Sequence, residues 1–275
     1  MRRRQLTSLI WEFTEPKTEP ATAPVAAQAS PSRTFVLAPF GGGSAYAVGD
    51  WLSDLRAPGE RVLALQYPGR GPRSAEPHAT DLMALARTAA EEIADHTEGP
   101  LVLVGHSLGA VLGYEIAHRL ELLGKDVELV AVSAARPPDL QRLDPAVVLS
   151  MTRGDWIEEL ATGGNAGLGA SPLADVADLA IPVLRADYLL LARYRPGPPR
   201  PLDCPLLALG GTADPWVERP HLDAWRSWTT GPFAAAVLPG DHFYYRGATA
   251  EFGGLIRSRL RHPAPAVALT PGRHL

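Results

Sequence analysis

Cysteine is almost absent from this 275-residue chain, because Cys204 is its only one. No disulfide can therefore form within the chain, and a reducing, cytoplasmic location is permitted and expected. Cys204 is followed by Pro205 and an apolar run that reads as a strand. We interpret this thiol as a buried structural group rather than a reactive one.

An excess of positive charge is also lacking. The formal net charge is −4 and the isoelectric point is about 6.1. Nucleic-acid binders usually present a strongly basic face, so composition gives no support for that class. The spacing of His, Cys, Asp and Glu matches no metal site, and there is no internal repeat.

No long hydrophobic run opens the chain. Arg2, Arg3 and Arg4 are followed only by the short apolar stretch 9–11, which Glu12 ends at once. A secretory signal needs an apolar stretch of about 7–15 residues. We therefore expect neither a signal peptide nor a membrane span, and a short docking segment for a partner is the alternative for residues 1–13.

Both ends of the chain differ from its middle. Residues 15–32 are rich in Pro, Ala, Thr and Ser and carry too little apolar surface to fold. We expect residues 1–32 to form a disordered N-terminal arm or linker and residues 263–275 a flexible tail. One folded domain, 33–262, lies between them, and the apolar fraction of 46% supports a full core for it.

Short apolar runs alternate with helical patterns across this domain. The runs predict strands at 34–38, 61–67, 101–104, 128–134, 205–210 and 234–238. The helical patterns lie at 49–55, 79–96, 108–123, 218–227 and 249–261. Continuous apolar runs are typical of strands buried on both faces. The alternation predicts an α/β fold with a mostly parallel, doubly wound sheet.

One stretch interrupts the alternation. From about residue 139 to 199 there is no convincing strand, only helical patterns and the glycine-rich segment 163–169. The stretch follows the fourth predicted strand. Ligands of open α/β sheets bind at the C-terminal edge of the strands, so we interpret 139–199 as a helical cap that controls access to that edge.

The strongest local signal is the pentapeptide 105–109, GHSLG, between a predicted strand and a predicted helix. A strand, tight turn and helix are the context of a nucleophile elbow, in which a strained turn exposes a serine. Gly105 and Gly109 would let strand and helix approach closely. We therefore predict that Ser107 is a covalent nucleophile.

A serine nucleophile needs a base and an acid that orients the base, in the chain order Ser, acid, His for this topology. His242 follows the last predicted strand and is the candidate base. Asp214 follows the fifth strand and is the preferred acid, whereas Asp139, after the fourth strand, is the alternative. Asp241 is next to the histidine in sequence and is interpreted as structural or solvated.

An oxyanion hole requires two backbone N–H groups directed at the developing charge. One is expected from Leu108, immediately after the nucleophile. The other is expected from the glycine-rich loop 39–44 after the first strand, with Gly41 preferred and Phe40 second. A flexible loop without a ligand is the alternative. A phosphate-binding loop fits poorly because no Lys-Ser/Thr pair follows the glycines.

Taken together, these segments resemble the type II, or editing, thioesterases of polyketide and nonribosomal peptide synthases, which have the α/β-hydrolase fold. The matching segments cover roughly residues 35–261 and lie at 39–45, 66–73, 76–77, 105–110, 182–188, 211–214 and 240–243. The family usually has His at position 40 and Ala at position 41, where this chain has Phe40 and Gly41. The N-terminal arm is also longer than the family's.

The resemblance implies hydrolysis of acyl thioesters on the phosphopantetheine arm of acyl or peptidyl carrier proteins, without a metal or redox cofactor. The enzyme would be a stand-alone monomer, and the cap would admit the arm with a short acyl chain. Basic residues in or near the cap are candidates for carrier binding, with a solvated helix face as the alternative: Arg185, Arg193, Arg195 and Arg200. No substrate-binding side chain is assigned.

Three other functions remain open. A carboxylesterase and a product-releasing, cyclising thioesterase would use the same fold and the same triad. A binding protein of this fold without catalytic activity belongs to a different functional class. Its weakness is that Ser, acid and His are all present in the required order.

Overall fold

The computed structural model describes residues 2–14, 31–162 and 170–261. In this part of the chain, eight strands form one sheet in the order β1-β2-β4-β3-β5-β6-β7-β8. The strands are β1 (Arg2–Gln5), β2 (Ile10–Thr14), β3 (Thr34–Ala38), β4 (Arg61–Leu65), β5 (Leu101–His106), β6 (Val127–Ser133), β7 (Leu206–Gly211) and β8 (Phe233–Leu238). The α-helices are α1 (Gly49–Leu55), α2 (Leu82–His96), α3 (Leu108–Leu122), α4 (Pro145–Ser150), α5 (Arg153–Leu160), α6 (Ala170–Arg193), α7 (Arg219–Ala224) and α8 (Thr249–Arg257).

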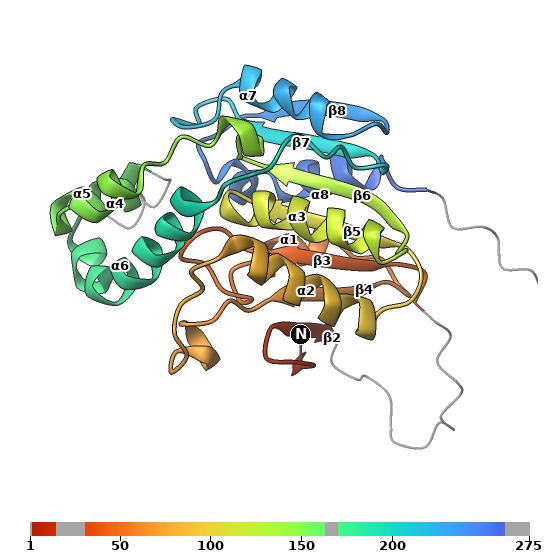
Figure 1. Ribbon diagram of the computed structural model, residues 1–275, viewed down its shortest axis with the longest axis horizontal. Coiled ribbons are helices and arrows are strands. Elements are labelled where there is room, and N and C mark those ends of the chain that lie inside the picture. The colour runs from red at the N-terminus through yellow and green to blue at the C-terminus, as the bar shows by residue number, and fades with distance from the viewer. Residues whose placement is uncertain (1, 15–30, 163–169, 262–275) are drawn as a thin grey trace, which may run out of the picture.

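Strands β3 to β8 are all parallel. Strand β3 lies in the middle, with β4 on one side and β5 on the other, so the sheet is wound in both directions from it. Successive residues of β5 face opposite cores. Leu101 and Leu103 pack with α2 and α3, whereas Val102 and Val104 pack with α1 and α8. Helices thus cover both faces (Figure 1), which explains the continuous apolar runs.

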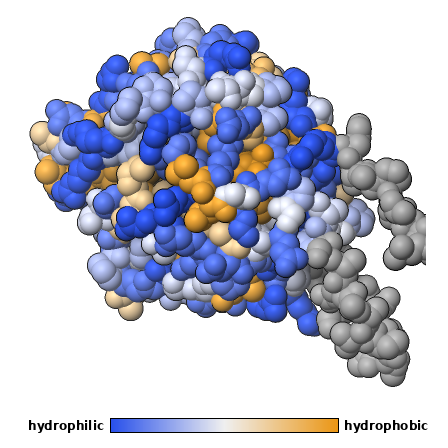
Figure 2. Space-filling view, turned by 45° about the vertical axis from the view of Figure 1, so that its right-hand side comes forward, coloured by the Kyte–Doolittle hydropathy of each residue, from blue (hydrophilic) through white to orange (hydrophobic). Residues whose placement is uncertain are grey.

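These observations confirm the fold predicted from the sequence. The six parallel strands begin and end within two residues of the predicted ranges. The match is close because strands buried on both faces need uninterrupted apolar residues, and because glycines and prolines separate them from the helices. The face shown in Figure 2 is mostly hydrophilic, with hydrophobic residues gathered near its middle and smaller hydrophobic areas toward its edge.

The start of the chain corrects the sequence-based expectation of a disordered arm over residues 1–32. Residues 2–14 form the antiparallel hairpin of β1 and β2, and β2 pairs antiparallel with β4 from Ile10 opposite Leu65 to Phe13 opposite Val62. An unpaired β4 would leave backbone N–H and C=O groups at a sheet edge, and the hairpin satisfies them. Leu9, Ile10 and Phe13 are buried. Residues 15–30 and 262–275 lie outside the described residues.

A polar contact fixes the hairpin to the sheet. Glu12 is buried on β2 and accepts a hydrogen bond of 2.6 Å from Arg61 Nε on β4 and another from Arg4 on β1. One carboxylate therefore joins three neighbouring strands. Sequence reasoning missed this role because it counted Glu12 only as the residue that ends an apolar stretch.

The segment between β6 and β7 is helical, as the predicted cap requires. Helices α4, α5 and α6 project to one side of the sheet (Figure 1). They enclose a small core of their own around Trp156, whose ring packs edge-on against Tyr188 at 5.3 Å. The glycine-rich stretch 163–169 lies outside the described residues. In the described part of the chain, no helix combines the length and the apolar character needed to cross a bilayer.

A buried charge cluster holds the opposite end of the sheet. Arg33, just before β3, donates from Nε to Glu128 at 3.1 Å and from Nη1 to Glu60 at 3.1 Å. Its Nη2 donates to the carbonyl oxygen of Arg261 at 2.7 Å. Because each buried charge has a partner of opposite sign and further hydrogen bonds, the desolvation cost of the cluster is offset.

Candidate active site

Ser107 lies at the turn from β5 into α3, at the C-terminal edge of the parallel strands. Its φ of 56° and ψ of −120° place a non-glycine residue in a region that L-residues rarely adopt. Its backbone N–H donates to the carbonyl oxygen of Ser133 on β6 at 2.8 Å. This strained turn is the geometry of a nucleophile elbow, and it exposes the hydroxyl above the sheet.

The glycines beside the elbow are there because any side chain would collide with backbone. A Cβ atom at Gly105 would lie 2.1 Å from the carbonyl oxygen of Gly109. A Cβ atom at Gly109 would lie 2.1 Å from the carbonyl oxygen of Ala38 on β3. Helix α3 can therefore start directly against two strands only with glycine at both positions.

The structure brings the predicted acid and base together. His242 follows β8, and its Nδ1 lies 2.8 Å from Asp214 Oδ2. The other carboxylate oxygen, Oδ1, accepts hydrogen bonds from the backbone N–H groups of Trp216 at 2.9 Å and Val217 at 3.1 Å. A carboxylate can only accept, so the imidazole donates from Nδ1 and keeps the lone pair of Nε2 for a proton.

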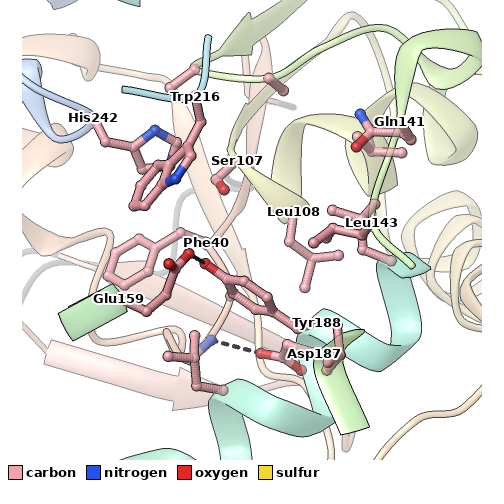
Figure 3. A pocket seen from close by; sticks show the side chains of 18 of the residues that line it. Phe40, Ser107, Leu108, Gln141, Leu143, Glu159, Asp187, Tyr188, Trp216 and His242 are labelled. Carbon is pink, nitrogen blue, oxygen red and sulfur yellow. Dashed lines mark hydrogen bonds between the residues drawn. The ribbon is translucent and has the colours of Figure 1, made fainter. Parts of the chain in front are cut away.

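Ser107 and His242 line the same cavity, whose volume is about 550 Å³. Figure 3 shows both side chains on one side of this cavity, with Trp216 beside the imidazole. The indole packs edge-on against the His242 ring at 4.8 Å. Ser107 and His242 line the cavity and Asp214 contacts His242, so the three residues predicted from the sequence lie in one region.

The alternative acids lie elsewhere. Asp139 is exposed and lines a separate hollow beside Pro138 and Tyr194. Asp241 accepts a hydrogen bond from the backbone N–H of Phe243 at 2.8 Å, which fits the structural role expected for it. Asp214 is the carboxylate that contacts His242.

The predicted oxyanion loop reaches the same cavity. Phe40, Gly41 and Gly42 line it together with Leu108. A Cβ atom at Gly41 would lie 3.9 Å from that of Leu108, so the loop after β3 and the N-terminus of α3 meet at one end of the cavity. Phe40 packs edge-on against Phe243, next to the candidate base, at 4.7 Å.

Sequence reasoning gave no role to Arg70 and Asp187, although both lie in segments that carried the family resemblance. The two side chains form a buried, two-pronged ion pair. Asp187 also accepts a hydrogen bond of 2.7 Å from the backbone N–H of Gly42 in the oxyanion loop, drawn as a dashed line in Figure 3. The arginine and the aspartate lie in two of the segments that carry the family resemblance, but the two residues are 117 positions apart in the sequence.

The cap contributes a second polar pair that the sequence did not reveal. Tyr188 donates to Glu159 Oε1 at 2.6 Å, and both line the cavity (Figure 3). Burial, followed by the neighbouring Glu159 carboxylate, raises the pKa of Tyr188 well above its usual range, so the phenol stays protonated and donates. Among the described residues, no arginine, lysine or histidine forms a salt bridge with Glu159.

The rest of the cavity wall is largely apolar. Besides three alanines, its aliphatic and aromatic side chains are Phe40, Leu108, Val111, Leu143, Val147, Val148, Met151, Leu160, Leu184, Leu191, Trp216, Val217 and Phe243. Such a lining suits an acyl chain better than a sugar or a nucleotide.

A second histidine lies behind His242, the candidate base. His106 is fully buried, and its Nδ1 is 2.9 Å from Ser133 Oγ, which is 2.7 Å from the hydroxyl of Tyr244. Its ring centroid is 4.9 Å from that of His242. Burial, and then the charges of His242 and Arg246, hold the pKa of His106 well below its usual range. The imidazole of His106 is therefore neutral and packs in the core next to His242.

The four candidate arginines for partner binding differ in their contacts. Arg200 pairs with the buried Glu115 at 3.0 Å. Arg185 donates to the carbonyl oxygen of Leu149 at 3.2 Å. Arg193 and Arg195 are exposed near the end of α6. In the described parts of the chain, no group of three or more His, Cys, Asp or Glu residues is arranged to hold a metal ion.

Comparison with known proteins identifies a family of hydrolases, in agreement with the arrangement of Ser107, His242 and Asp214. The family model of the thioesterase domain matches residues 33–260. A probable cadicidin biosynthesis thioesterase of Streptomyces griseus is 36% identical over 212 residues, which are 76% of this chain and 57% of that protein. The chain thus spans less than two thirds of the length of this relative.

Solved structures agree over more of the chain. The type II thioesterase BorB from the borrelidin biosynthetic cluster has a TM-score of 0.76 at 35% identity, covering 83% of this chain and 93% of BorB. The thioesterase RedJ from the prodiginine pathway of Streptomyces coelicolor has a TM-score of 0.74 at 32% identity, covering 84% and 91%. With a serine elbow, an aspartate-bound histidine and a capped cavity on this fold, the chain belongs to the thioesterase domain family.

Proposed function

We propose that this protein is a type II thioesterase. It would hydrolyse short or aberrant acyl thioesters from the phosphopantetheine arm of carrier proteins in polyketide or nonribosomal peptide synthesis. The observation that carries the proposal is the 2.8 Å contact between His242 and Asp214, in a cavity that the elbow residue Ser107 also lines. The similarity to the thioesterases BorB and RedJ supports the thioester substrate.

The first half of the reaction follows from these positions. Ser107 Oγ attacks the thioester carbonyl carbon while His242 Nε2 takes the hydroxyl proton. The N–H groups of Leu108 and Gly41, with Phe40 as the second choice, stabilise the oxyanion. When the tetrahedral adduct collapses, the carbon–sulfur bond breaks and the imidazolium protonates the leaving thiolate. The acyl group is then an ester of Ser107.

The second half uses the same groups with water. His242 Nε2 removes a proton from a water molecule, and the oxygen attacks the acyl carbonyl carbon. The second adduct expels Ser107 Oγ, which regains its proton from the imidazolium, and the carboxylic acid leaves. Asp214 keeps the imidazole in the required tautomer and stabilises its charge. The proposed sequence of steps uses no metal or redox cofactor.

The cavity supports a short acyl substrate. Its volume of about 550 Å³ lies within the range of small-molecule sites. The cap helices form much of its wall, with Val148 from α4 and Leu184 from α6 among the lining residues. A carrier protein would dock near the cap, and the exposed Arg193 and Arg195 are the candidate contacts for its acidic surface.

The test is hydrolysis by purified protein of acetyl- and propionyl-carrier protein and of the matching oxygen esters. We expect thioesters to turn over faster. A serine-directed fluorophosphonate should label the wild-type protein and leave Ser107→Ala unlabelled. Faster turnover of oxygen esters would instead identify a carboxylesterase. With a hydroxyacyl- or peptidyl-carrier protein as substrate, cyclised products in mass spectra would identify a product-releasing enzyme. Absence of both labelling and turnover would identify a binding protein.

A further inference from the structure

The inference concerns Arg70 and Asp187. Asp187 lies on the cap helix α6, and Arg70 lies in the loop after β4. Their side chains are only 4% and 5% exposed. Arg70 Nη1 donates to Asp187 Oδ2, and Nη2 donates to Oδ1. A buried pair of this kind is retained at a desolvation cost, so its hydrogen bonds need a reason beyond stability.

Each member of the pair also binds the oxyanion loop. Asp187 Oδ2 accepts from the backbone N–H of Gly42 at 2.7 Å. Arg70 Nη1 donates to the carbonyl oxygen of Gly43 at 3.2 Å. The ion pair therefore binds the N–H group of Gly42 and the carbonyl group of Gly43, two consecutive residues of the loop.

Two residues that follow β4 hold the loop at its other points. The hydroxyl of Tyr67 donates to the carbonyl oxygen of Pro39 at 2.8 Å. The side chain of Gln66 accepts from the backbone N–H of Ala45 at 3.1 Å. Fixed points thus lie on both sides of Phe40 and Gly41, the two loop residues that are candidates for the second oxyanion donor.

We infer that Arg70 and Asp187 are positioning residues that preorganise the oxyanion hole and couple it to the position of the cap. This inference rests on the proposed function. Three consecutive glycines have many conformations available, and Gly42 adopts a φ of +83°, so an unanchored loop would lose the alignment of its N–H groups. Oxyanion stabilisation depends on donors that are already in place.

The coupling follows from where Asp187 is located. It belongs to α6, and Leu184 one turn earlier on α6 also covers the loop, with its Cδ1 3.4 Å from a Cβ position at Gly42. Any displacement of α6 away from the sheet removes the acceptor of the Gly42 N–H. The oxyanion hole is therefore complete only while α6 packs against the oxyanion loop. Hydrolysis of the acyl group is thus favoured when the cap is closed.

The experiment compares Asp187→Asn with Asp178→Asn. The first change keeps the shape and one acceptor but removes the charge that holds Arg70. The second removes an exposed cap ion pair, Asp178 with Arg153 at 2.9 Å, and serves as the control. The measurements are kcat and KM with a propionyl thioester, and the affinities of an alkyl trifluoromethyl ketone and of an uncleavable ketone analogue lacking the sulfur.

We expect Asp187→Asn to lower kcat by about 10²-fold, the size of the loss of one oxyanion donor, with KM changed little. Affinity for the trifluoromethyl ketone, which forms a tetrahedral adduct on Ser107, should fall in parallel. Affinity for the uncleavable analogue should stay constant, and Asp178→Asn should match wild type in all four values.

A lower melting temperature of Asp187→Asn with unchanged kcat would show that the ion pair only stabilises the fold, and would overturn the inference. A rise in KM with equal weakening of both ligands would overturn it in favour of substrate binding. If Asp187→Asn does not fold, Arg70→Lys, which keeps the charge but loses the two-pronged geometry, gives the same comparison. If the wild type hydrolyses no thioester, the proposed function fails. The affinities for the two ketones would still test whether the ion pair preorganises the oxyanion hole.

Discussion

A Cβ atom on Gly109 would lie 2.1 Å from the carbonyl oxygen of Ala38. The first turn of α3 therefore rests directly on the backbone of β3, the strand that leads into the oxyanion loop. Ser107 lies two residues before this contact. Its orientation depends on the absence of a side chain at position 109.

Gly109→Ala tests this dependence. We expect α3 to be displaced, with a loss of about 1–3 kcal/mol in the free energy of unfolding from overpacking and a large drop in the rate of fluorophosphonate labelling. Gly113→Ala in the same helix is the control, because a Cβ there meets nothing within 4 Å. It should stabilise the protein by about 0.5–1 kcal/mol. Wild-type labelling by Gly109→Ala would contradict the prediction.

Asp214→Asn should abolish most of the catalysis without unfolding the protein. An amide at this position favours the wrong imidazole tautomer of His242, and kcat should fall by about 10⁴-fold. Asp139→Asn is the matched control, because Asp139 is exposed and lines a different hollow. Steady-state kinetics of both variants decide between the two acids. A larger loss for Asp139→Asn would reverse the assignment.

Glu159→Gln should change which acyl group is preferred. Glu159 places a carboxylate in a largely apolar cavity, hydrogen-bonded to Tyr188, and this charge favours acyl groups that carry an ammonium. Hydrogen bonds to charged groups contribute about 1.5–3 kcal/mol, so the ratio of kcat/KM for β-alanyl over propionyl thioester should fall about tenfold or more.

The control for this comparison is Glu158→Gln, which changes an exposed neighbour on the same helix. Its β-alanyl to propionyl ratio should equal that of the wild type. An unchanged ratio in Glu159→Gln would show that the carboxylate does not reach the acyl group.

His106 should make the protein less stable in mild acid. Its pKa in the folded state is well below its usual value, whereas the unfolded chain takes up a proton near pH 6.5. The stability contributed by neutral His106 is thus complete above about pH 6.5 and is lost as the pH falls toward the folded-state pKa, by up to about 1.4 kcal/mol per pH unit.

Urea unfolding at about pH 7.5, 6.5 and 5.5 measures this dependence. The difference in unfolding free energy between wild type and His106→Gln should shrink toward low pH. His118 and His221 also have lowered pKa values, but both remain in the variant and cancel in the difference. A difference that stays constant with pH would contradict the prediction.

The sequence predicts the features that depend on local patterns. Strands buried on both faces need continuous apolar residues, and the elbow at Ser107 has glycines at fixed distances, so both are visible within a few positions. His242 and Asp214 could be chosen because the fold places strand ends at one edge of the sheet. These are short-range signals combined with one rule of topology.

The features that the sequence did not reveal depend on distant pairing. Strand β1 consists of four exposed residues, Arg2–Gln5, with no alternation to mark it, and its hairpin is ordered by β4 about fifty positions later. Arg70 and Asp187 form a pair only because α6 folds back over the sheet. A single sequence contains no measure of such contacts.

The charge cluster around Arg33 also joins the start and the end of the parallel domain. Arg33 Nη2 donates to the carbonyl oxygen of Arg261, so the two boundaries of the parallel domain are neighbours, at the end of the strands away from Ser107. The first strand and the last segment of the parallel domain are therefore held together at the edge opposite the turn that carries Ser107.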